Sequence, residues 1–196
     1  GVDEYRDLGW SRQVRSSICR KGCAGYNSVL SNQASIGENC YLEVSYVHDR
    51  AVIGSNVVLS YIDIHGEAVP DNVVMHGLKQ RNGRFVARIY GIHDNPKENR
   101  LFGRNLEEIR RELGVELWPE SAHTLWTAEL YPEKETISEA VAASLELHAL
   151  IVGGDRTKLA AWKASNRKSL CSGFNAAEAD AIIAWDRRMM ELVQMD

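Results

Sequence analysis

A polar segment near the middle of the chain carries the densest group of side chains that can bind a small molecule. Arg88, His93, Asp94, Asn95 and Lys97 follow one another closely. Arginine and lysine donate hydrogen bonds to phosphate, and aspartate accepts them from sugar hydroxyls. Most of these residues lie in a stretch rich in turn formers, which predicts a loop. The pattern therefore predicts a sugar- or phosphate-binding loop, with an ordinary surface loop as the alternative.

Histidines offer a second chemistry. His48, His65 and His76 lie in or beside the repeated segments described below. Acyltransferases built on a β-helix place a histidine there as a general base, because imidazole titrates near neutral pH. A hexapeptide-repeat acyltransferase acting through His48 or His65 is therefore one alternative, and it would bind an acyl-coenzyme A at a trimer seam. Histidines on polar turns are the more ordinary interpretation.

The common motifs of nucleotide-binding and hydrolytic sites are absent from the sequence. Gly153, Gly154 and Asp155 can in principle hold a phosphate at the start of a helix, but paired glycines more commonly end one. The residues alone therefore assign no catalytic group and no metal ligand.

A threefold repeat must position these side chains. Residues 36–42, 53–59 and 69–75 share one pattern: an aliphatic residue, Gly or Pro, a polar residue, Asn, two apolar residues, and Leu or Met. Spacings of 17 and 16 residues (36 to 53, 53 to 69) suit three short strands and three corners per coil. The repeat predicts a single-stranded parallel β-helix, and a period close to three hexapeptides resembles the left-handed kind. Three unrelated turns are the alternative.

Stacking of the coils predicts which side chains meet. Equivalent strands of adjacent coils lie about 4.8 Å apart, and Asn at a corner tolerates left-handed backbone angles. The expected ladders are Ile36, Ile53 and Val69 on one inner face, Leu42, Leu59 and Met75 on another, and Asn39, Asn56 and Asn72 at a corner.

Three parts are expected along the chain. Residues 1–26 are predicted to be a helical lead-in, residues 27–135 the β-helix with capping strands and loops, and residues 136–196 a helical linker toward a following domain. The coils begin abruptly, and an open strand edge promotes aggregation. We therefore expect more chain before Gly1, or a second subunit covering this end.

Capping signals predict the helices of the second half. Residues 105–108 and 136–139 resemble capping boxes, which predicts helices through Leu113 and to residue 151 or 152. Asp155 is expected to cap a shorter helix with Trp162, and residues 175–178 to open the last helix. That helix should bury an apolar stripe made of Ala179, Ile182, Ile183, Met189, Met190 and Val193.

Composition narrows the classes of function. A net charge of −4 with 26% charged residues gives no electrostatic argument for nucleic acid or an anionic membrane. We find no apolar run long enough to span a membrane and no signal peptide. Cys19, Cys23, Cys40 and Cys171 show no Cys-x-x-Cys pairing, so we expect reduced thiols in a cytoplasmic protein.

Several linked motifs occur in a fixed order. They are VPDNVVMHGLKQ (69–80), FVARIYGIHDNPK (85–97), LW (117–118), LWTAELYP (125–132) and SLCSGFNAAEAD (169–180). This set, which spans most of the chain, resembles the family of L-fucokinases and fucose-1-phosphate guanylyltransferases. The last motif is similar to the segment that precedes the kinase domain of the bacterial bifunctional enzyme.

The resemblance implies a role in the salvage of L-fucose. In this family a kinase domain uses ATP to phosphorylate the anomeric oxygen of the sugar, and a guanylyltransferase domain joins the product to GTP, giving GDP-L-fucose and pyrophosphate. A magnesium ion would neutralise phosphate charge in both steps. The neighbouring domains of the same polypeptide would be the partners of this chain.

The chain departs from the family pattern at both active sites. It lacks the Gly-rich signature of sugar nucleotidyltransferases and the phosphate loop of small-molecule kinases. We therefore expect a noncatalytic scaffold, without a cofactor of its own, between the two catalytic domains. In the alternative, the loop from Arg88 to Lys97 contacts sugar or nucleotide in the guanylyltransferase site.

Overall fold

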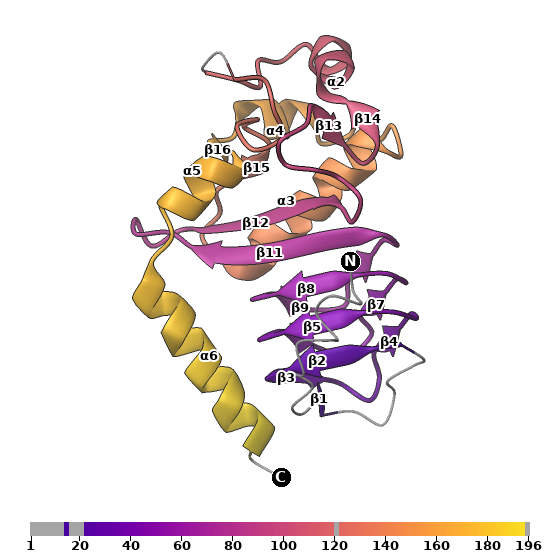
Figure 1. Cartoon of the computed structure of the whole chain (residues 1–196), viewed down its shortest axis with the longest axis vertical. Helices are drawn as coiled ribbons and strands as arrows, with labels where there is room; N and C mark the ends of the chain where they lie inside the picture. The colour runs from indigo at the N-terminus through magenta and orange to yellow at the C-terminus, as the bar shows by residue number, and fades with distance from the viewer. Residues whose placement is uncertain (1–13, 16–21, 120–121, 195–196) are drawn as a thin grey trace.

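The computed structural model describes residues 14–15, 22–119 and 122–194 (Figure 1). Most of the predicted helical lead-in, residues 1–26, lies outside these ranges. Where it is described, the helical prediction is wrong: Val14–Arg15 (β1) and Ala24–Tyr26 (β2) are strands. Both pair in parallel with strands of the coil, β1 with β3 and β2 with β5, so sheet pairing outweighs the loosely helical spacing of this segment.

Three sheets form the walls of a parallel β-helix (Figure 1). The first stacks β1 on β3 (Ser28–Leu30), β6 (Tyr46–Val47) and β9 (Asp63–Ile64). The second stacks β4 (Ser35–Ile36), β7 (Val52–Ile53) and β10 (Ala68–Val69). The third stacks β2, β5 (Tyr41–Glu43), β8 (Val58–Ser60), β11 (Val73–Lys79) and β12 (Phe85–Gly91). The predicted β-helix is therefore confirmed.

The predicted ladders are present. Ile53 lies in register with both Ile36 and Val69, and Leu59 with both Leu42 and Met75; all six side chains are buried. The corner asparagines Asn39, Asn56 and Asn72 have φ angles of 55°, 57° and 60°. The Nδ2 of Asn39 donates to Asn56 Oδ1 at 3.4 Å, and the Nδ2 of Asn56 donates to Asn72 Oδ1 at 2.9 Å. Each coil is thus bonded to the next at this corner.

A hairpin and a helix close one end of the coil. β11 and β12 pair antiparallel across a turn at residues 80–84. α3 (Ile137–Ile151) packs against β12 and begins with a complete capping box between Thr136 and Glu139. The Oγ of Ser144, buried within α3, donates to the carbonyl of Ala87 at 2.6 Å. Figure 1 shows this helix lying behind the hairpin.

Smaller elements surround the hairpin and α3. α2 (Leu106–Leu113) is capped by the side chain of Asn105 and ends at Gly114, as predicted. Asp155 was expected to cap α4 (Leu159–Ala164), but its carboxylate accepts from the amide of Thr157 and the helix begins after Lys158. The remaining elements are β13 (Arg100–Leu101), β14 (Arg104–Asn105), β15 (Tyr131–Pro132), β16 (Arg167–Lys168) and α5 (Leu170–Asn175).

The last helix, α6 (Ala179–Gln194), runs back along the outside of the coil (Figure 1). Its predicted start at residues 175–178 is slightly early, because Asn175 is the last residue of α5. The predicted buried stripe is wrong in part: Met189 is buried, but Ile183 is 57% exposed and Met190 41%. Periodicity cannot tell how much of an apolar face finds a neighbour, and here polar bonds help to hold the helix to the coil.

Two corners of the coil supply those bonds. The Nδ2 of Asn27 donates to the backbone oxygen and the Oδ1 of Asp186, at 2.8 and 2.7 Å. The indole Nε1 of Trp185 donates to the carbonyl of Val44 at 2.8 Å. The C-terminal helix is therefore fastened to the first coils, although it follows them by more than a hundred residues of chain.

One hydrophobic cluster joins coil and helices, since residues such as Leu59, Leu147 and Trp162 belong to it together. The division at residue 136 stays a prediction. Cys23, Cys40 and Cys171 are free, and burial raises the pKa of the Cys40 thiol to about 12; Cys19 lies outside the described residues. Within the described part of the chain, no helix has the length and apolar character needed to cross a membrane.

Candidate functional site

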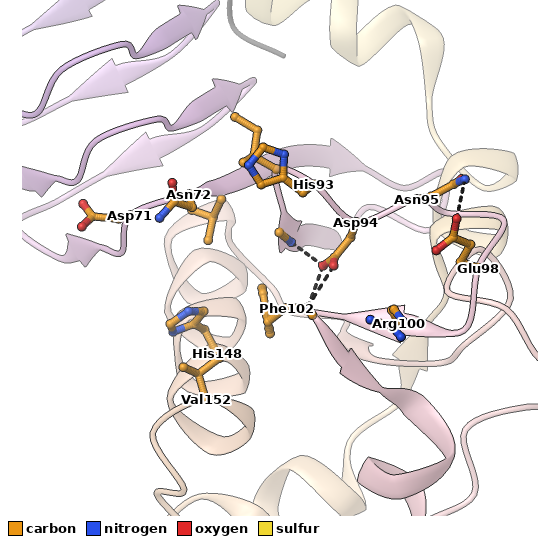
Figure 2. A pocket seen from close by; sticks show the side chains of 14 residues that line it. Asp71, Asn72, His93, Asp94, Asn95, Glu98, Arg100, Phe102, His148 and Val152 are labelled. Atoms are coloured by element: carbon orange, nitrogen blue, oxygen red, sulfur yellow. Dashed lines mark hydrogen bonds between the residues drawn. The ribbon is translucent and has the colours of Figure 1, made fainter.

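A cavity of about 590 Å³ opens where the loop after β12 meets the C-terminal half of α3 (Figure 2). Its size falls within the range of ligand pockets, about 300–1,000 Å³. Side chains from the last corner of the coil, from the loop and from α3 line it together. They include Asp71, Asn72, His93, Asp94, Asn95, Glu98, Arg100, Phe102, His148 and Val152.

Asp94 organises the cavity wall. Its Oδ2 accepts from the backbone amides of Gly91 and Phe102, at 2.7 and 2.6 Å, and its Oδ1 accepts from the amide of Gly103 at 3.1 Å (Figure 2). One carboxylate thus ties the end of β12 to the turn between β13 and β14. Such bonds are stronger than neutral ones, and they occupy much of the acceptor capacity that a ligand would need.

The structure brings together three of the five predicted binding residues. His93, Asp94 and Asn95 all line the cavity. The side chain of Asn95 also forms hydrogen bonds within its own loop. Its Nδ2 donates to Glu98 at 3.2 Å and its Oδ1 accepts from the amide of Lys97 at 3.0 Å. Lys97 is exposed and is not among the lining residues. His93 is exposed at the cavity.

Arg88 lies elsewhere. It is 8% exposed on β12, opposite His76 of β11, and its Nη1 donates to the carbonyl of Leu170 in α5 at 3.1 Å. Its Nε has no hydrogen-bond partner, and burial lowers the pKa of the guanidinium. Sequence reasoning could not find this contact, because α5 reaches the strand only through the tertiary fold. Whether any of the five residues binds a ligand stays a prediction.

The charge of the cavity favours hydroxyl groups over phosphate. Asp71, Asp94 and Glu98 supply acidic side chains, and Arg100 is the basic side chain among the lining residues. A dianionic phosphate would meet net repulsion there, whereas sugar hydroxyls can donate to the carboxylates. Sequence analysis missed Asp71, Arg100 and His148, which come from three separate elements and show no shared pattern.

The family model of the fucose pyrophosphorylase domain matches residues 2–136, more than half of the chain. The chain belongs to the fucose pyrophosphorylase family. This confirms the fucose-1-phosphate guanylyltransferase family indicated by the motifs. The searches of curated proteins and of solved structures found no match.

A group of side chains in this fucose pyrophosphorylase chain has the spacing of metal ligands. Among the described residues, one group of three side chains has ligand atoms close enough together to hold an ion: His48, Asp63 and His65. Two imidazoles and one carboxylate do not suit Mg²⁺, which prefers oxygen ligands and keeps several waters. The magnesium ion expected for the parent enzyme stays a prediction, and we assign no step to it here.

The partly buried imidazole of His76 is expected to make the stability of this family member depend on pH. Burial, with the nearby charge of Arg88, lowers the pKa of His76 to about 4, and its Nε2 lies 3.2 Å from the hydroxyl of Tyr90. A histidine of the unfolded chain takes up a proton near pH 6.5. Below about pH 6.5 the unfolded chain gains a proton at His76 that the folded protein does not accept until the pH nears 4. The folded state is therefore fully stable, with respect to this group, above about pH 6.5 and loses stability as the pH falls toward 4.

We expect the free energy of unfolding to fall by about 2 kcal/mol more in the wild type than in His76→Gln between about pH 7 and about pH 5. Denaturant unfolding of both proteins at the two pH values measures this difference. Other histidines, including His148, whose pKa is also lowered by burial, contribute equally to both proteins. Equal losses in the two proteins would contradict the assignment.

Proposed function

We propose that this chain is a noncatalytic β-helix scaffold of a fucose-1-phosphate guanylyltransferase, the enzyme that joins fucose-1-phosphate to GTP and releases pyrophosphate. In the parent protein it would join the catalytic part of the guanylyltransferase to a fucokinase domain that uses ATP and L-fucose. Membership of the fucose pyrophosphorylase family supports the reaction. The two flanking domains, and self-association through the open end of the coil, remain predictions.

The observation that carries the scaffold role is the use of the polar groups predicted to bind substrate. Asp94 holds three backbone amides, and Arg88 lies buried under α5. Both side chains form hydrogen bonds with the backbone of this chain. A site poised for a sugar phosphate would direct these charges toward the ligand.

The fastening of α6 supports a connecting role. Asn27 and Trp185 bond this helix to the first coils, while α3 packs on the hairpin at the other end. Helices packed at both ends of the coil fix the relative orientation of whatever is attached to them better than a flexible linker does. In the parent enzyme, this arrangement would keep the two catalytic domains at a defined separation.

Sugar binding is the second candidate, and the cavity of Figure 2 is the observation in its favour. Acidic side chains around His93 suit the hydroxyls of fucose better than the phosphates of a nucleotide. The acyltransferase alternative, in which His48 or His65 would act as the general base, remains a prediction.

Titration of the ¹⁵N-labelled chain with fucose-1-phosphate, and separately with GDP-L-fucose, separates the two candidates. A scaffold predicts no shifts in the amides of Gly91, Phe102 and Gly103, which report directly on the Asp94 carboxylate. L-Fucose alone is a third test ligand, because the cavity favours hydroxyls over phosphate, and GTP alone serves as the control. Saturable shifts at these amides, abolished by His93→Ala, would replace the scaffold with a binding site.

A further inference from the structure

Two imidazoles and one carboxylate gather on the outer face of the first wall. Tyr46 lies in register with Asp63, and Val47 with Ile64, so His48 and His65 are the next neighbours on adjacent coils. Val47 and Ile64 are fully buried. Because side chains alternate along a strand, the residues on either side of them point outward. The wall thus presents a square of Tyr46, His48, Asp63 and His65.

The distances within this square are short. The Nε2 of His48 lies 2.6 Å from Asp63 Oδ1, and the Nε2 of His65 lies 3.1 Å from Asp63 Oδ2. The three residues offer ligand atoms that all lie within 4.8 Å of one another. One carboxylate therefore faces the same nitrogen of both histidines.

Ring stacking holds the two imidazoles in nearly parallel planes, so one ring must turn before both lone pairs can point at one ion. The rings of His48 and His65 stack at 3.9 Å with an interplanar angle of 17°, and Tyr46 stacks on the other side of His48 at 3.8 Å and 12°. His48 is thus held between two rings. His65 is the outermost of the three and can rotate more freely.

The group is open to solvent, with side-chain exposures of 30% for His48, 16% for Asp63 and 45% for His65. Within the described ranges, the ion pairs of Asp63 are with these two histidines. Without an ion, the Nε2–H of His48 donates to this carboxylate and the Nε2–H of His65 faces it. Each nitrogen gains a lone pair for a metal when its proton resides on Nδ1 instead.

We propose that His48, Asp63 and His65 bind one zinc-class transition-metal ion that links adjacent coils. Neutral imidazole and carboxylate are ordinary ligands of Zn²⁺ and Co²⁺, and three protein ligands leave a further position for water. Binding requires the exposed His65 ring to turn out of its stack on His48, so that its Nε2 faces an ion shared with His48 and Asp63. This site is independent of the proposed scaffold function and lies on another part of the molecule from the cavity.

Zn²⁺ and Co²⁺ are the probes for the test. Calorimetric titration of the chelator-stripped chain with Zn²⁺ at neutral pH should give one equivalent bound, and Co²⁺ should produce a visible absorption band. Zn²⁺ at a hundred times its dissociation constant should raise the unfolding midpoint by roughly 5–10 °C. Mg²⁺ at the same concentration should do neither.

Variants identify the ligands. His48→Gln and His65→Gln should each weaken Zn²⁺ binding by at least about tenfold. His123→Gln is the matched control. His123 also pairs with a carboxylate, Glu107 at 2.8 Å, and its ring also stacks, on Trp118. It does not belong to the group of three possible metal ligands found among the described residues. Unfolding of each variant in chelator, without metal, checks that the fold is intact.

Three outcomes would overturn the site. They are no Zn²⁺ binding by the wild type, unchanged binding by a folded His48→Gln, His65→Gln double variant, and an equal loss of binding in His123→Gln. Because each readout is metal binding or stability, none of these results depends on the reaction of the parent enzyme.

Discussion

Gly54→Ala is expected to destabilise the protein by about 3 kcal/mol, because a methyl group at this position meets the next coil. An added Cβ would lie 2.4 Å from Asp71 Oδ1, 2.7 Å from the backbone nitrogen of Asp71 and 2.9 Å from the carbonyl carbon of Pro70. The Asp71 carboxylate also accepts from the amide of Ser55 at 2.7 Å. Relief of the clash would require the two coils to separate and this bond to break. Denaturant unfolding monitored by circular dichroism measures the loss.

Gly173→Ala is the matched control for this prediction. A Cβ there would meet its nearest atom, the Cδ of Arg88, at 3.5 Å, an ordinary contact. Gly173 lies within α5, where alanine is favoured over glycine by up to about 1 kcal/mol. The control should therefore be neutral or slightly stabilising. Similar losses at Gly54 and Gly173 would mean that close coil stacking does not account for the glycine of the repeat.

Leu59→Ala is expected to cost about 3–5 kcal/mol, the usual range for removing a buried leucine side chain. Leu59 is fully buried in β8, in register with Leu42 on one side and Met75 on the other. Because hydrogen bonds and neighbouring coils hold the backbone in place, the cavity left by the truncation can collapse only in part. The free energy of unfolding from denaturant titration gives the size of the effect.

Val52→Ala tests whether the stability of the coil depends on its inward-facing side chains rather than on those facing outward. Val52 is 48% exposed on β7, next to Ile53 of the buried ladder. Removing two methyl groups from an exposed strand position should cost less than about 1 kcal/mol. If Val52→Ala were as damaging as Leu59→Ala, the inward and outward faces assigned to the coil would be wrong.

The β-helix was predictable because its information is local and periodic. Each coil repeats one order of residue types, and the period alone sets which residues stack. The left-handed backbone at Asn39, Asn56 and Asn72 followed from the tolerance of asparagine for that conformation. A second corner has the same conformation at Val44 (φ 47°) and Tyr61 (φ 56°), and it could not be foreseen because valine and tyrosine disfavour positive φ.

The candidate site was predictable only where its members are contiguous. His93, Asp94 and Asn95 reach one cavity because one loop carries them. Arg88 was misplaced, since α5 folds over its strand. The pairing of His48 with His65 could have been found, because the 17 residues between these positions equal one coil. The shared carboxylate of Asp63 was not recognised.

By itself, the sequence determined the coil, its ladders, its corner asparagines and the family, because all of these follow from residue order over one or two periods. The tertiary structure alone decided what each polar group does. Long-range packing decided that Arg88 is buried under α5 and which face of α6 meets the coil. These choices depend on contacts between segments far apart in the chain, and no local pattern encodes them.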